Sequence, residues 1–196
     1  MYHKHHTEAL VLKSVAESTD NKRLVLLTRD LGVVFAHVKS GRTGASKLKA
    51  GIQEYSFGEY SLLHGKIGWR CVSVRTEGNY FEILKTSKEK VVSKTRVLNL
   101  LQALVTGEEP NKKIFEDVMS FLEFLNVFEG GELDLLEALV IARVLFELGF
   151  LRHEAKFEYL FGSSQIDTDI LNKVAPDKKD LIKIINEALR AAEVKT

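Results

Sequence analysis

Apolar and polar positions alternate along the first 76 residues with the period of two that is typical of β-strands. Five such runs follow one another at 8–15, 23–29, 33–39, 54–63 and 67–76. The turn Asp30-Leu31-Gly32 ends in a glycine at the position where a positive φ is needed. In the fourth run the apolar phase shifts at Gly58, which predicts a β-bulge. Five short strands with tight turns predict a small closed barrel, with an oligonucleotide/oligosaccharide-binding (OB) fold favoured and an SH3-like barrel as the alternative.

From about residue 80 the apolar period changes to 3.6, which predicts helices over 91–105, 110–128, 133–151 and 177–194. The helix over 133–151 is apolar on nearly every side, so we expect other helices to surround it. The fold class is therefore α+β with two domains: an OB-fold barrel over 1–80 and an all-helical domain over 81–196. We expect a hinge near 85–90.

The net charge of +1 conceals an asymmetry between the two parts of the chain. Residues 1–80 hold 12 Lys and Arg against 7 Asp and Glu, whereas residues 81–196 hold 16 against 20. The stretch 38–53 connects two predicted strands, contains three glycines and has no acid. Its cations suit a polyphosphate backbone, although a solvated basic connector is the alternative: Lys39, Arg42, Lys47 and Lys49. A P-loop is excluded because Leu48 follows Lys47 where that motif needs Ser or Thr.

An OB fold also binds single strands through aromatic side chains on which bases stack. The predicted barrel offers five such aromatics, most of which we expect to fill its core: Phe35, Tyr55, Phe57, Tyr60 and Trp69.

No pattern of catalytic or cofactor-binding residues stands out. The six histidines form no metal-binding or hydrolase motif, and His3, His5 and His6 read as a polar lead-in rather than a metal site. The single Cys71 excludes an intrachain disulfide and a cysteine-based zinc module. We therefore expect a protein that is not an enzyme and that binds neither a cofactor nor a metal. The chain has neither a membrane-spanning run nor a signal peptide, so we expect a cytoplasmic protein.

Several segments carry a family resemblance in the right order: 7–15, 23–32, 38–53 and the aromatic strand that follows. The basic stretch supplies counterparts of a K-G-x-R element, a Ser-x-Leu and a Gln-aromatic pair: Lys39, Gly41, Arg42, Ser46, Leu48, Gln53 and Tyr55. The run L-F-E-L-G-F at 145–150 is similar to the end of the family's central helix. Together these segments resemble the RecO family of bacterial recombination mediators.

The resemblance implies a non-enzymatic protein with an OB-fold domain that binds single- and double-stranded DNA and anneals complementary strands. With RecR such proteins help to load RecA onto DNA coated by single-stranded DNA-binding protein, whose acidic C-terminal tail docks on RecO. This implies a bacterial, nucleoid-associated location. It assigns the phosphate contacts to the cations of the basic stretch, with further contacts from the barrel: Lys22, Arg23 and Arg70.

The chain departs from the family in two ways. Many relatives carry a four-cysteine zinc module after the central helix, and no cysteine stands there in this chain. The region 152–176 is also compressed, which leaves the tail-peptide site unassigned. We expect the tail peptide to bind in an apolar groove beside a cation on the central helix, and Arg143 is the candidate cation. The alternative is that Arg143 pairs with Glu147, four residues later.

Two other functions stay open. The first is a protein–protein adaptor whose basic barrel face binds the acidic surface of a partner. The second is a metal-dependent hydrolase, which would need a carboxylate cluster that the basic part of the chain lacks.

Overall fold

The computed structural model describes residues 3–17, 21–39, 46–105, 107–152 and 154–192. Its contacts divide the chain into two compact units. The barrel unit comprises Met1–Thr86 with Thr106–Lys112, and the helical unit comprises Ser87–Val105 with Lys113–Thr196. The sequence alone suggests one boundary near residue 80, whereas the contacts group 106–112 with the barrel. A backbone hydrogen bond of 3.0 Å from Val33 N to Gly107 O accounts for part of this grouping.

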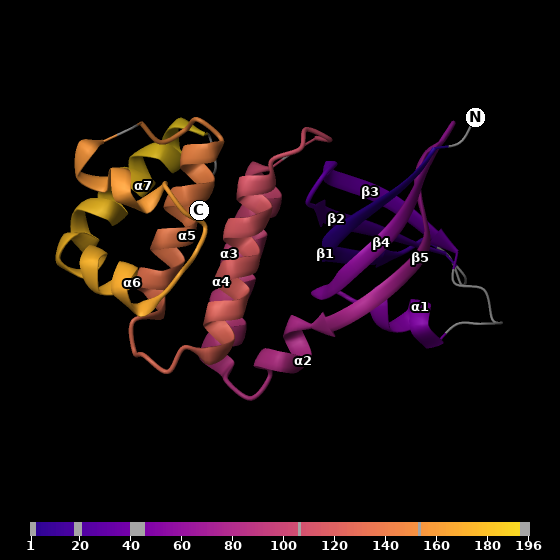
Figure 1. Cartoon of the computed structure of the whole chain (residues 1–196), viewed down its shortest axis with the longest axis horizontal. Helices are drawn as coiled ribbons and strands as arrows, with labels where there is room; N and C mark the ends of the chain where they lie inside the picture. The colour runs from indigo at the N-terminus through magenta and orange to yellow at the C-terminus, as the bar shows by residue number, and fades with distance from the viewer. Residues whose placement is uncertain (1–2, 18–20, 40–45, 106, 153, 193–196) are drawn as a thin grey trace. The chain divides into compact units, whose positions relative to one another are not determined.

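The barrel unit is built on strands β1 (Lys4–Ala16), β2 (Asn21–Thr28), β3 (Gly32–Lys39), β4 (Ser56–Gly65) and β5 (Gly68–Asn79). They close in the order β1-β2-β3-β5-β4, and the pairing is antiparallel except between β3 and β5. The long strand β1 makes closure possible because its first half pairs with β4 and its second half with β2. This topology confirms the predicted OB fold and is drawn in indigo to magenta in Figure 1.

The alternation read from the sequence decides which side chains fill the barrel. Alternate positions of each strand turn inward and form one apolar core, with Tyr60 and Trp69 among its largest members. Gly32 has the expected positive φ of 72° at the β2–β3 turn. The pairing of β4 with β5 shifts register between Phe57 and Gly58, which confirms the predicted bulge.

The second half of the basic stretch is a helix and not the loop that its glycines suggest. Ser46–Gly51 forms α1, which packs against β5 and β4 and lies between β3 and β4 in the chain (Figure 1). Ile52, just after it, is fully buried, and Leu48 packs against the barrel core. A helix of six residues is too short to show a 3.6-residue period, so apolar burial and not local pattern determines it.

The helical unit contains α3 (Lys88–Leu104), α4 (Lys112–Val127, whose first residue belongs to the barrel unit) and α5 (Leu133–Glu147). The 3₁₀ helix η1 (Ala155–Leu160), α6 (Thr168–Val174), the 3₁₀ turn η2 (Ala175–Asp177) and α7 (Lys178–Ala191) follow. The four predicted helices are present. The predicted helix over 133–151 ends at Glu147, because Gly149 adopts a φ of 74°. The short helices α2 (Tyr80–Leu84, in the barrel unit), η1 and α6 were not predicted.

Within the helical unit, α5 packs against both α3 and α7. Its buried side chains cover most of its circumference, as the apolar pattern predicts, and the remaining face carries Asp134, Glu137 and Ile141. Among the helices of the described ranges, none combines the length and apolar character that crossing a bilayer requires.

Candidate nucleic-acid interface

A row of outward-facing side chains crosses all five strands of the barrel. Strand register pairs Lys4 with Leu63, Leu63 with Arg70, Arg70 with His37, and His37 with Arg23. All of them are exposed except Leu63, which is half-buried. Core side chains lie next to four of them along the strands, as Leu24 does next to Arg23 and Leu62 next to Leu63, so the alternation of the strands places the row on the outer face. We call this set the basic row.

Two exposed apolar side chains adjoin the basic row on the same face. Phe35 lies two residues before His37 and is 55% exposed, and Val72 lies two residues after Arg70 and is 40% exposed. The other aromatics named from the sequence are less available: Tyr60 and Trp69 are buried, while Tyr55 and Phe57 are half-buried. Phe35 is therefore the one of these five whose ring faces solvent beside a line of cations. Arginine and lysine can neutralise phosphates while an aromatic ring stacks on a base.

Glu17 partly neutralises the row at one end. Its carboxylate lies 2.8 Å from His37 Nδ1 and 3.8 Å from Arg23 Nε. Elsewhere the strands that carry the row are poor in acids, since no Asp or Glu occurs in 31–53 or in 60–76. The row therefore keeps a net positive charge, with a single carboxylate competing for two of its members.

The structure brings some of the predicted contact residues together and separates others. Arg23 and Arg70 belong to the basic row, and Lys39 is exposed at the end of β3 on the same face. Lys49 is exposed on α1. Arg42 and the side chain of Lys47 lie outside the residues that the structure describes.

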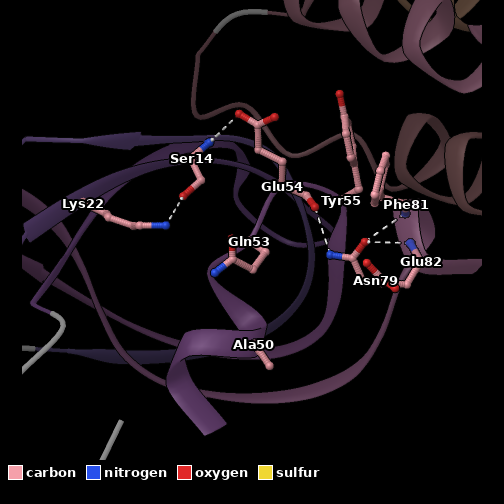
Figure 2. A pocket seen from close by; sticks show the side chains of 9 residues that line it. All are labelled: Ser14, Lys22, Ala50, Gln53, Glu54, Tyr55, Asn79, Phe81 and Glu82. Atoms are coloured by element: carbon pink, nitrogen blue, oxygen red, sulfur yellow. Dashed lines mark hydrogen bonds between the residues drawn. The ribbon is translucent and has the colours of Figure 1, made fainter. Parts of the chain in front are cut away.

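Lys22 points away from the row, into a cavity of about 680 Å³ (Figure 2). Its Nζ donates to Ser14 Oγ at 3.3 Å, and Ser14 N donates to Glu54 at 3.2 Å. On the other side of the cavity, Asn79 donates to the Glu54 backbone oxygen and accepts from the N–H groups of Phe81 and Glu82. Two carboxylates thus share this cavity with one lysine, an arrangement that disfavours an anionic ligand.

Strand register identifies contact residues that composition does not. Lys4, His37 and Val72 carry no motif, and Phe35 could not be separated from the core aromatics by type. The alternation within 33–39 is the signal that could have shown it, because it places residues 35, 37 and 39 on one face.

Arg143 lies inside the helical unit, with 1% of its surface exposed. Its guanidinium donates to the backbone oxygens of Leu160, Ser164 and Gln165 at 2.7, 3.0 and 3.1 Å. The carboxylate that faces it is Asp117 of α4, 3.4 Å away, and not Glu147. Arg143 therefore offers no surface to a partner in this structure, and its position argues for a structural role.

The remaining candidate groups, the cysteine thiol and possible metal ligands, form no reactive site in the part of the chain that the structure describes. Burial raises the pKa of the Cys71 thiol to about 12, so the group stays protonated and unreactive near neutral pH. Within the described ranges, no three His, Cys, Asp or Glu side chains gather closely enough to hold a metal ion.

Known proteins resemble the chain at low but significant identity. No family model matches it. A protein named DNA repair protein RecO from Clostridium novyi is 27% identical over 119 residues, or 61% of this chain and 46% of that protein. The protein of that name from Bacillus pumilus is 25% identical over 146 residues, or 73% of this chain and 55% of that protein. A third, from Desulfitobacterium hafniense, is 27% identical over 118 residues.

The chain spans about half the length of these curated relatives. The order of its parts, an OB-fold barrel followed by helices, is the one that the sequence resemblance implies. The chain is thus similar to part of several proteins named DNA repair protein RecO, at 25–27% identity over 60–73% of its length.

Proposed function

We propose that this chain acts in DNA repair and recombination as a DNA-binding protein without catalytic activity of its own. The observation that carries the proposal is the basic row, which lines up Lys4, Arg70, His37 and Arg23 across the barrel beside the exposed ring of Phe35. The name DNA repair protein, carried by the similar proteins, points the same way. The outer face of strands β2 and β3 is also where OB folds bind oligonucleotides.

The geometry suits a ligand that is read by charge and shape and not by base sequence. Cations of the row contact phosphates, which releases counterions and makes affinity fall steeply with salt. Phe35 stacks on a base, and every base has a ring face to offer. Neutralised phosphates also lower the repulsion between two complementary strands, which is how such a surface promotes annealing. Single- and double-stranded DNA are both ligands in this proposal.

The proposal includes the partners that the family resemblance implies: RecR, the acidic C-terminal tail of single-stranded DNA-binding protein, and RecA indirectly. Because Arg143 is buried, the tail would have to bind at another surface of the chain. The helical groove of about 280 Å³ beside Arg152 is a poor candidate, because Glu154 and Glu187 line it too and disfavour an acidic peptide.

The test is fluorescence anisotropy of a labelled single-stranded oligonucleotide, titrated between about 50 and 200 mM salt. We compare the wild type with the double variant Arg23→Ala/Arg70→Ala. Arg75→Ala is the matched control, because Arg75 is a 69% exposed arginine of β5 that pairs with Glu59 at 2.8 Å. The double variant should lose affinity and flatten the log–log salt slope by about 0.7 for each phosphate contact removed. The control should resemble the wild type.

Binding that is absent in the wild type, or equal in the double variant and the wild type, would contradict the assignment of DNA to the basic row. In the first case the protein adaptor becomes the better reading. A pull-down with an acidic partner surface would then respond to the same two substitutions.

A further inference from the structure

The tip of the β4–β5 hairpin presents an apolar side chain to water. Gly65 pairs with Gly68, so Lys66 and Ile67 form the two-residue turn between them. Ile67 is 94% exposed, which makes it the most exposed large apolar side chain in the described part of the chain. Two-residue hairpin turns normally hold Asn, Asp or Gly, because those residues suit the backbone and the solvent. At this exposure the isoleucine adds little to the packing of the barrel, and its side chain is available to a ligand.

The tip rests on a rigid base. Trp69 follows the turn, and its ring meets His64 of β4 and His5 of β1 edge-on, with centroid distances of 4.7 and 5.2 Å. Trp69 is only 6% exposed, yet its Nε1 has no hydrogen-bond partner among the described residues. These ring contacts tie Trp69, two residues after Ile67, to strands β1 and β4 at the base of the hairpin.

The charge around the tip identifies the class of ligand. No acid occurs from residue 60 to residue 76, and Lys66 adjoins Ile67 directly. Arg70 and Lys4, two cations of the basic row, lie at the hairpin base through their common neighbour Leu63. An apolar protein pocket would explain Ile67 but not its cationic surroundings, and an anionic membrane, which suits both features, does not fit the DNA-binding function proposed above. A nucleic acid explains both, since it offers phosphates and an apolar gap between stacked bases.

We propose that Ile67 is a wedge that inserts between bases where duplex DNA gives way to single strand. The proposal rests on the function proposed above and adds a structural preference to it: the single strand follows the basic row, and the hairpin tip meets the last base pair. Apolar side chains that enter a base step unstack it partly, and the step needs neither specific hydrogen bonds nor a particular sequence. No bond is made or broken.

The test uses a duplex with a single-stranded extension and 2-aminopurine at the last paired position, because the emission of this base rises on unstacking. The wild type should increase the emission, and Ile67→Ala should abolish the increase. Ile67→Ala should also bind the junction about 50-fold more weakly, since three buried carbons are lost at about 0.8 kcal/mol each, while binding to plain single strands changes less than about twofold. Ile67→Leu, which keeps the volume, should retain the signal.

Val127→Ala is the matched control, because Val127 is 68% exposed in the helical unit and lies far along the chain from the barrel. It should leave both the emission and the affinities unchanged. Both sites are on the surface, so the three variants should fold normally, as far-UV circular dichroism can show.

Three results would overturn the wedge. In the first, the wild type binds single strands but leaves the junction emission unchanged, and the proposed function survives without the wedge. In the second, Ile67→Ala weakens single-strand and junction binding equally, which makes Ile67 an ordinary contact. In the third, the wild type binds no DNA, and the proposed function fails together with the wedge.

Discussion

The buried pair of Arg143 and Asp117 predicts a specific loss of stability in the helical unit. We consider Arg143→Met, which keeps most of the side-chain volume and removes the charge. The change deprives three backbone oxygens of their donor: those of Leu160, Ser164 and Gln165. It also leaves Asp117, which is fully buried, with Lys113 at 2.9 Å as its remaining cation.

The magnitude follows from how these groups are satisfied. Breaking a buried ion pair by removing one partner costs about 3–5 kcal/mol. We expect the middle of that range, because Lys113 still compensates part of the Asp117 charge, whereas the freed backbone oxygens add to the loss. With a urea m-value of about 2 kcal/mol/M, a loss of about 4 kcal/mol lowers the midpoint by roughly 2 M.

Two probes can assign the loss to one unit of the chain. The only tryptophan, Trp69, reports on the barrel, while circular dichroism at 222 nm reports mainly on the helices. Arg143→Met should shift the helical transition and leave the fluorescence transition in place. Arg190→Met, at an exposed position of α7, is the control and should shift neither. The double variant Arg143→Met/Asp117→Leu should recover part of the loss, because no buried charge is then left unpaired.

The same cluster predicts a dependence on pH. Burial raises the pKa of Asp117 above its ordinary value of 3.8, and the Lys113 and Arg143 charges oppose that rise. A carboxyl with a raised pKa holds its proton in the folded state after the unfolded chain has lost it. Stability therefore falls as pH rises from about 3.8 through the folded pKa. Asp117→Asn should remove this slope. A helical midpoint that moves by less than about 0.5 M in Arg143→Met, with the slope intact in Asp117→Asn, would refute the reasoning.

Three further predictions concern the barrel. Phe35→Ala should weaken single-strand binding by about 1–3 kcal/mol in anisotropy titrations while the unfolding midpoint stays constant, and Phe35→Trp should restore it; equal affinity for all three proteins would rule out stacking. Glu17→Gln should tighten DNA binding and steepen its salt dependence, because it frees His37 and a neighbouring arginine; unchanged binding would place the DNA elsewhere. Gly58→Ala should destabilise the barrel by several kcal/mol, because its methyl group would overlap a β5 carbonyl. In Gly68→Ala the methyl group meets no atom within 4 Å, so the change should cost only about 1–3 kcal/mol of backbone strain. Loss of Trp69 fluorescence in urea measures both, and similar midpoints would contradict the steric argument.

The sequence predicts the strands and long helices well because each of them repeats its pattern over several residues. The period of two locates all five strands, and the phase shift at Gly58 locates the bulge. Elements such as α1, η1 and α6 are too short for a period to emerge, and tertiary burial of Ile52, Phe157 or Leu171 stabilises them. Such burial depends on residues far away in the chain, which no local pattern records.

The residues of the candidate site were likewise only partly predictable from the sequence. Counting charges identifies the basic part of the chain and nominates Arg23, Arg70 and Lys22 alike. Only strand register separates them, since it places Arg23 and Arg70 on the outer face and turns Lys22 toward Ser14. Register is a long-range property, because His37 joins residues 23 and 70 through pairings on two sides. The proposed ligand surface is therefore a product of barrel closure and not of any one motif.

Arginine illustrates how position decides the use of a charge. Arg70 alternates with the buried Trp69 and Cys71, so its strand exposes it and leaves the guanidinium available to an anion. Arg143 stands in a helix whose neighbouring positions Ala142 and Val144 are also buried, on the side away from the partly exposed face that carries Asp134, Glu137 and Ile141. A cation in such a place must find its partners inside the protein, and Asp117 with three backbone oxygens supplies them. The apolar character of 133–151 was visible in the sequence, yet our sequence-based prediction assigned Arg143 to a partner groove or to pairing with Glu147. A charge in a segment that other helices surround is better explained as serving the fold than as serving a ligand.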